Sequence, residues 1–110
     1  MLVTSTQLKA ISVIQEKKFI QMLAVEVTER FKPINLTQIR LLNDISEFVK
    51  EAHRFEFNYD DDIEQFVYLK FLYPSFAKLP HSESVIEILT TPDRHPEIKI
   101  NELIHYFENR

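Results

Sequence analysis

A chain of 110 residues is near the commonest size for one domain, and 45% of its residues are hydrophobic, as in globular proteins. The formal net charge of -4 comes from 13 basic and 17 acidic residues that are scattered along the chain, so no basic stripe is present and nucleic acid is not an expected partner. The absence of cysteine excludes disulfides, thiol catalysis and thiolate metal sites, and it fits a reducing compartment.

The sequence contains no glycine, the residue that supplies positive φ in hairpin turns and phosphate-binding loops. A β-rich fold would have to turn on Asn and Asp alone, whereas helices need glycine only at some C-caps. Rossmann and P-loop patterns are excluded because both require glycines. The composition therefore predicts an all-α protein.

The apolar runs of the sequence are short. Runs such as residues 22–25 are far below the ~18 residues needed to span a bilayer. Residues 1–18 lack the charged start and unbroken apolar core of a signal peptide. We therefore expect a cytoplasmic protein without a membrane span.

The first predicted helix covers about residues 6–31 and ends before Pro33. Thr4 and Gln7 have capping-box spacing at its start. Its two apolar seams are offset across residues 15–18, so a kink, or two helices in series in place of one continuous helix, is possible.

The second predicted helix covers about residues 36–55, and Asn35 and Gln38 have capping-box spacing at its start. Its apolar residues fall on one face, and its charged residues, Glu51 and Arg54 among them, fall on the other. The pattern is typical of an amphipathic helix with one buried face.

The third predicted helix begins near Asp61 and ends near Tyr73, before Pro74. Two interpretations fit its acidic start, residues 60–62. An aspartate can cap the helix while further acids favour the first turn, or the carboxylates can hold a metal. We prefer capping, because a calcium loop of the EF-hand type needs a glycine and ligands at alternate positions.

The C-terminal half of the third helix is apolar on nearly every side, which indicates a helix that is central in a bundle or partly covered by a partner. Lys70 projects into the same face as Ile63 and Phe66. A lysine stem that snorkels near the helix C-terminus explains it, and so does a buried ion pair with an acid of another helix. We prefer the snorkelling interpretation.

Two further helices are predicted, one over about residues 82–89 and one that starts at Pro96 with His95 as its cap. No internal repeat, low-complexity tract or long linker divides the chain. The sequence therefore predicts a single helical domain over residues 1–110, a compact bundle of about five helices with the third helix central.

Local catalytic and metal patterns are missing. No two of the four histidines lie three or four residues apart, as helical zinc ligands do. The Glu-x-x-His pattern of di-iron bundles needs two copies, and here it occurs once, at Glu102 and His105. We expect no catalytic residue, no metal and no cofactor. An enzyme whose site is assembled across helices remains an alternative.

Aromatic residues are concentrated between positions 55 and 76. Aromatic side chains fill cores and also anchor binding interfaces. Both interpretations are open for four of them, and our hypothesis is an apolar partner-binding patch formed by the 55–59 connector and the outer face of the third helix: Phe57, Tyr59, Tyr68 and Tyr73. Alanine at the three tyrosines should then weaken partner capture and leave the melting temperature almost unchanged.

The order of motifs resembles small all-helical proteins encoded beside spike and effector genes of bacterial type VI secretion systems. The resemblance covers about residues 46–107, with a weaker echo in residues 19–31. Its motifs are Phe55-Glu56-Phe57, the segment from Asp60 to Leu69, Tyr73-Pro74-Ser75-Phe76, Ile88-Leu89, and the segment from Pro96 to Ile100. The resemblance implies a cytoplasmic adaptor or chaperone that holds an effector for loading, and it carries no catalytic residues.

The leading hypothesis is therefore a non-enzymatic, protein-binding accessory module whose partner is an effector or a spike component. The alternative is an immunity protein that neutralises a toxin, because an acidic surface suits a basic catalytic cleft. A homo-oligomer is also compatible with the sequence.

Overall fold

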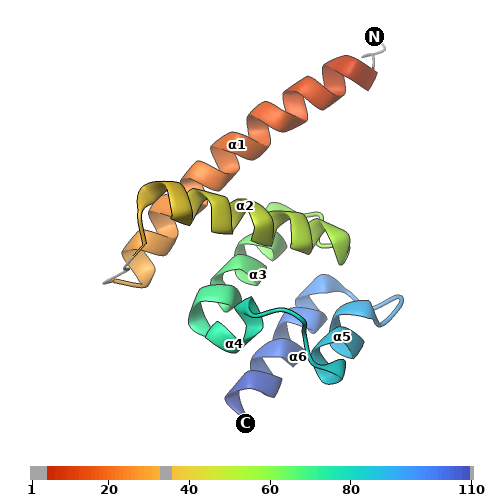
Figure 1. The fold of residues 1–110 in the computed structure, drawn as a ribbon. Helices are drawn as coiled ribbons and strands as arrows, with labels where there is room; N and C mark the ends of the chain where they lie inside the picture. Colours follow the sequence, from red (N-terminus) through yellow and green to blue (C-terminus); the bar gives the residue numbers. More distant parts are fainter. Residues whose placement is uncertain (1–4, 33–35, 110) are drawn as a thin grey trace. The chain divides into compact units, whose positions relative to one another are not determined.

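The computed structural model describes residues 5–32 and 36–109, and all regular structure within them is helical. The helices are α1 (Ser5–Arg30), α2 (Gln38–Arg54), α3 (Asp60–Leu72), α4 (Pro74–Ala77), α5 (Glu83–Thr90) and α6 (Pro96–Glu108) (Figure 1). The prediction of an all-α protein is confirmed. One helix was not predicted, the single turn of α4, which starts at Pro74, where the fixed φ of proline suits a first helical position.

Helix α1 is continuous through residues 15–18, so the question left open by the sequence is decided in favour of one helix (Figure 1). The capping predictions at Thr4 and Asn35 fall outside the described residues. Helix α2 begins at Gln38, two residues later than predicted. Thr37 accepts a hydrogen bond from the Arg40 N–H at 3.2 Å through its hydroxyl, which places a capping side chain directly before the first helical residue.

The start of α3 differs from the prediction. The N-cap position is Tyr59, which is extended and makes no side-chain cap bond, so the interpretation of an aspartate as the cap is wrong. Asp60, Asp61 and Asp62 instead occupy the first turn. There the partial positive charge of the helix N-terminus favours carboxylates, as the sequence indicated.

The two later helices are capped by side chains. Ser82 accepts a hydrogen bond from the Val85 N–H at 3.3 Å, and His95 Nδ1 accepts one from the Glu97 N–H at 3.2 Å. The predicted cap at His95 is thus confirmed. Without glycine, the chain uses Glu56 and Asp93 at positive φ, where a left-handed residue costs roughly 1–2 kcal/mol.

The chain forms two compact units, which we call the N-terminal unit (residues 1–46) and the C-terminal unit (residues 47–110); the division falls within α2. The prediction of a single domain stays a prediction. In the N-terminal unit the buried apolar residues follow helical spacing on α1 and α2: Leu23, Ala24, Val27, Leu41 and Ile45.

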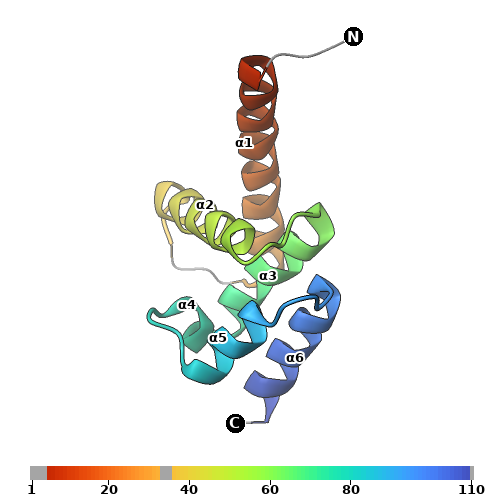
Figure 2. The ribbon, with the colours of Figure 1, turned by 90° about the vertical axis from the view of Figure 1, so that its right-hand side faces the viewer.

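In the C-terminal unit α3 contacts α4 and α6, and α5 lies beside α6 (Figures 1 and 2). The core is aromatic. The Phe66 ring lies 5.1 Å from the Phe57 ring and 5.2 Å from the Phe76 ring, and Phe71 meets Phe48 of α2 edge-on at 5.6 Å. These contacts place α3 at the centre of the C-terminal unit, as predicted for the third helix. Within the described part of the chain, no helix is long and apolar enough to cross a bilayer.

Candidate functional site

Two of the four residues predicted to bind a partner lie in the core. Phe57 is fully buried against Phe66, and Tyr68 is buried while its hydroxyl donates a 2.7 Å hydrogen bond to Glu64 Oε1. The connector folds back so that Phe57 N–H donates to the Ala52 carbonyl at 2.9 Å, and this turn directs the Phe57 ring inward. Phe57 and Tyr68 therefore do not present their rings to a partner in this conformation.

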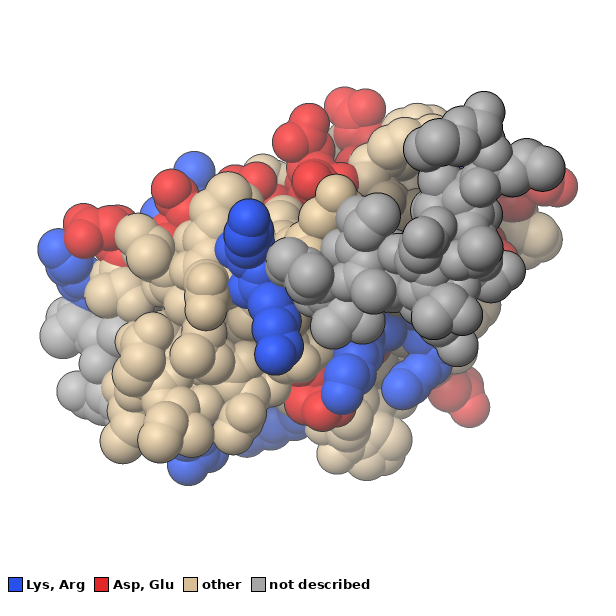
Figure 3. All heavy atoms as spheres, turned by 90° about the horizontal axis from the view of Figure 1, so that it is seen from above, with Lys and Arg blue, Asp and Glu red and all other residues tan. Residues whose placement is uncertain are grey.

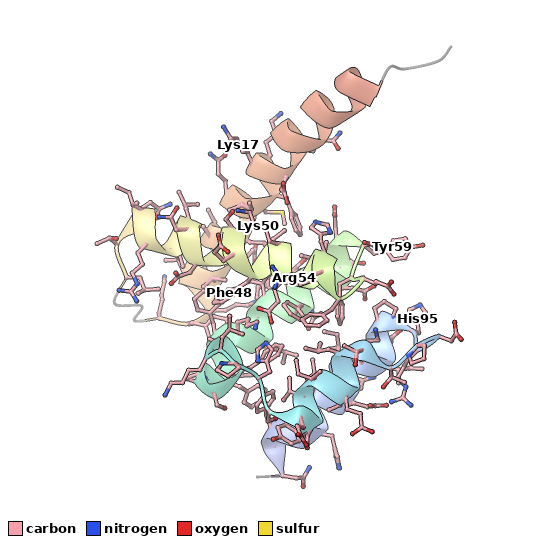
Figure 4. The ribbon with its side chains drawn as sticks, turned by 45° about the vertical axis from the view of Figure 1, so that its right-hand side comes forward. Lys17, Phe48, Lys50, Arg54, Tyr59 and His95 are labelled. Atoms are coloured by element: carbon pink, nitrogen blue, oxygen red, sulfur yellow. The ribbon has the colours of Figure 1, made fainter. Side chains whose placement is uncertain are left out.

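The other two predicted residues are more accessible. Tyr73 is half-buried and stacks on Phe107 with ring centroids 5.1 Å apart. Its hydroxyl donates to Glu108, and this hydrogen bond raises the pKa of Tyr73 above its usual value. Tyr59 is 71% exposed and points away from the helices (Figure 4). The structure thus does not bring the four residues together as one exposed patch, and Tyr59 alone of the four presents its whole ring.

The most polar feature of the core is centred on Lys70. Its side chain is 0% exposed, and its Nζ lies 2.7 Å from Glu51 Oε2 of α2 and donates to the Phe76 carbonyl at 3.0 Å. The snorkelling interpretation is therefore wrong, and the buried ion pair that was its alternative is present. Because α4 follows α3 immediately, the Phe76 carbonyl and ring cover the end of α3 where a lysine would otherwise reach water.

Aromatic rings enclose the Lys70 ammonium. Its Nζ lies 3.9 Å from the ring centroid of Phe76, 5.2 Å from that of Phe66 and 5.5 Å from that of Phe48, within the range of cation–π attraction. Burial lowers the pKa of Lys70, and the hydrogen bond and charge of Glu51 oppose that change.

His81 completes the cluster from the connector between α4 and α5. Its Nε2 contacts Glu51 Oε1, its ring stacks on Phe76 at 5.3 Å, and its side chain is 3% exposed. Each Glu51 oxygen thus has its own partner, and no buried side-chain nitrogen or oxygen of the described residues lacks a hydrogen bond. We call Glu51, Lys70 and His81 the buried charge cluster. The cluster joins α2, α3 and the connector. A substrate cannot reach Lys70, because its side chain is fully enclosed.

A second lysine is buried near α5. Lys99 of α6 donates from its Nζ to the Leu89 carbonyl at 2.9 Å, so its charge lies at the C-terminus of α5, where a cation is favoured. Sequence reasoning missed Glu51, His81 and Lys99. A signal for Glu51 was available, because it lies between the buried residues Val49 and Ala52, at the edge of the apolar face of α2.

Two larger hollows, and one smaller hollow of about 260 Å³, border α5 in the C-terminal unit. The first, which we call the Arg54 hollow, has a volume of about 470 Å³ and is lined by Glu51, Arg54, Phe55, Leu79, Pro80, His81 and Ile86. The second, the α5–α6 groove, has a volume of about 430 Å³ and is lined by Ile88, Ile98, Asn101, Glu102, His105 and Tyr106. Leu79 is 69% exposed and Ile98 is 49% exposed, so each of the two larger hollows has an accessible apolar residue at its edge.

A further hollow of the C-terminal unit, with a volume of about 480 Å³, is mainly acidic and is lined by Asp61, Asp62, Glu64, Gln65 and Glu97. On the face shown in Figure 3, acidic and basic groups are interspersed and neither sign covers the surface. Among the described residues, no group of three or more His, Asp or Glu side chains is arranged to hold a metal ion. The three aspartates at the start of α3 form no such group either. The Arg54 hollow and the α5–α6 groove differ from the acidic hollow in having an exposed aliphatic residue in their lining.

No protein-family model, curated protein or solved structure matches this chain.

Proposed function

We propose that this chain is a protein-binding accessory module that uses the surface around α5. The observation that carries the proposal is the pair of hollows on the C-terminal unit, each with an exposed aliphatic side chain at its edge: Leu79 at one and Ile98 at the other. Single exposed apolar residues are common on protein surfaces. Apolar residues gathered around a concavity are typical of binding sites, because a ligand there loses water on several sides at once.

The more specific proposal is a cytoplasmic adaptor or chaperone that holds a type VI secretion effector, and its support is the resemblance over residues 46–107. An immunity protein that binds a toxin is the second candidate, supported by the net charge of -4. The genes next to this one distinguish the two: a spike gene favours the adaptor, and a lone toxin gene favours the immunity protein. An enzyme has less support, because Lys70, whose burial lowers its pKa, is fully enclosed and cannot contact a substrate.

Affinity capture from native cells tests the proposal. The tagged full-length chain should retain one protein in stoichiometric amount, and either Leu79→Ser or Ile98→Glu should reduce that retention, since each replaces an exposed aliphatic side chain at a hollow with a polar one. Ile39→Glu is the matched control, because Ile39 is an exposed isoleucine of the N-terminal unit.

Two outcomes would contradict the proposal. One is repeated recovery of the chain alone at high yield. The other is a partner whose retention is the same for the native chain and for both hollow variants. Size-exclusion chromatography of the captured material shows whether the retained protein is a second copy of the chain.

A further inference from the structure

The walls of the Arg54 hollow are apolar. Phe55 follows the end of α2, Leu79 and Pro80 belong to the connector before α5, and Ile86 lies on α5 itself. Leu79 and Pro80 are exposed, and Phe55 is half-buried. The volume of about 470 Å³ lies within the range of roughly 300–1,000 Å³ of ligand pockets. The hollow can therefore take at least one large apolar side chain.

The edge of the hollow carries an unbalanced positive charge. Arg54 is exposed at the C-terminal end of α2, and within the described residues its guanidinium makes no ion pair or hydrogen bond. Glu51, the acid that lines the same hollow, already uses one oxygen for Lys70 and the other for His81. Glu56, which lines a smaller neighbouring hollow together with Arg54, forms no ion pair with it.

The apolar walls and the Arg54 cation at the edge restrict the chemistry of a segment that can bind in the hollow. An apolar segment alone would cover the Arg54 guanidinium and remove its water without supplying a partner, which opposes binding. A basic segment would add charge repulsion. A carboxylate next to the apolar side chain would accept paired hydrogen bonds from the planar guanidinium, the geometry that arginine provides and lysine does not.

We infer that the Arg54 hollow binds a partner segment in which a large apolar side chain is adjacent to a carboxylate. The inference depends on the proposed function, which it deepens by naming the chemistry of the segment. The carboxylate is the side chain of an Asp or Glu of that segment, and binding only of peptides that end in a free C-terminal carboxylate is an outcome that would contradict this assignment.

The test uses short synthetic peptides that carry a fluorescent label and the full-length chain. In the first set a Leu or Phe lies next to Glu. The second and third sets have Gln or Lys in place of that Glu. The peptides of the fourth set end in Leu or Phe, with either a free or an amidated C-terminus. Binding is followed by fluorescence anisotropy. We expect the Glu set to bind about tenfold more tightly than the Gln set, as for one charge-assisted hydrogen-bonded pair, and the free and amidated C-termini of the fourth set to bind alike.

Variants of α2 and of Leu79 test whether this selectivity for acidic peptides arises at the Arg54 hollow. Arg54→Gln should abolish the difference between acid and amide peptides, and Arg54→Glu should reverse it in favour of the Lys set. Lys50→Gln, which removes an exposed cation one turn earlier on the same helix, should leave the selectivity unchanged. Leu79→Ser should weaken all sets alike. Circular dichroism of each variant verifies that it is folded.

Equal binding of acid and amide peptides, or an acid preference that Arg54→Glu retains, would overturn the inference. So would failure of every peptide set while native capture remains sensitive to Ile98→Glu, a result that leaves the proposed function intact and moves the interface to the α5–α6 groove. Loss of native capture altogether is the separate result that removes the proposed function.

Discussion

Lys70 Nζ lies 2.7 Å from Glu51 Oε2, and this ion pair joins α3 to α2 inside the C-terminal unit. The Lys70 side chain is fully enclosed and that of Glu51 is nearly so. Removing two charges from water costs free energy, and their mutual attraction recovers it only with good geometry and further hydrogen bonds. His81 and the Phe76 carbonyl supply those bonds here. Partial removal and complete replacement of the buried charge cluster should therefore have different consequences.

Lys70→Met removes the cation and leaves Glu51 in the core with His81 as its remaining partner. We expect the free energy of unfolding to fall by about 3–5 kcal/mol, the usual cost of breaking a buried ion pair from one side. Urea denaturation followed by circular dichroism measures the change. Lys50→Met is the matched control, because the exposed Lys50–Glu47 pair is worth about 0–1 kcal/mol. A Lys70→Met variant as stable as the control would contradict a stabilising role for Lys70.

Replacing the whole cluster should cost less than breaking it. In the triple variant Lys70→Met, Glu51→Leu and His81→Phe, no buried charge remains and apolar groups of similar size fill the space. Such replacements are often neutral or stabilising by about 1–4 kcal/mol relative to the ion pair. We expect the triple variant to be more stable than Lys70→Met in the same urea titration. A triple variant less stable than the single one would show that the cluster contributes net free energy to the fold.

The stability should depend on pH through Lys70. Its pKa in the folded chain is below the ordinary 10.5 because burial penalises the ammonium more than Glu51 favours it. Between the lowered pKa and 10.5, the unfolded chain binds more protons at this position than the folded chain, so stability rises with pH. The Lys70 contribution is present above 10.5 and is lost as pH falls through the folded pKa. The stability of the native chain relative to Lys70→Met should therefore increase as pH is raised toward 10.5.

Tyr73 has the opposite effect in the same pH range, so this measurement needs a control. Its raised pKa means that its contribution is present below the ordinary value of 10.0 and is lost as pH rises through the folded pKa. The comparison is therefore made with Tyr73→Phe in both chains. A stability difference that is flat or declines with increasing pH would contradict the assignment to Lys70.

Aromatic residues of the 55–59 connector should differ in how much they contribute to the free energy of unfolding, according to whether they are buried or exposed. Phe57→Ala should lower the free energy of unfolding by about 3–5 kcal/mol, because it leaves a cavity beside Phe66. Tyr59→Ala should change it by less than about 0.5 kcal/mol, because the Tyr59 side chain is exposed and makes no cap bond. Thermal unfolding of both variants measures the contrast. Equal destabilisation would show that the connector packs differently from the arrangement described here.

The helices were predictable from local chemistry. The lack of glycine, the apolar spacing and the positions of proline indicated helices over nearly the segments observed, and His95 was recognised as a cap from its place before Pro96. The errors concern the short helix α4, which was not predicted, and single residues at helix ends. Thr37 caps α2 at the start of the helix, and Tyr59 rather than an aspartate precedes α3, because several polar residues near each start compete for one position.

The candidate site was predictable only in part. The surroundings of an aromatic residue depend on the direction of the chain around it, and the return of the connector to Ala52 directs Phe57 into the core while Tyr59 stays outside. The Arg54 hollow could not be anticipated, because its walls come from segments about thirty residues apart, such as Phe55 and Ile86.

The sequence alone determined the all-helical character, because helix formation depends on the propensities and spacing of neighbouring residues. Only the tertiary structure decided the fate of Lys70. Its position on α3 allowed both a snorkelling stem and a buried ion pair, and the choice depended on which groups surround the ammonium. Glu51, Phe76 and His81 come from three other segments, so their arrival around Lys70 is a property of the fold.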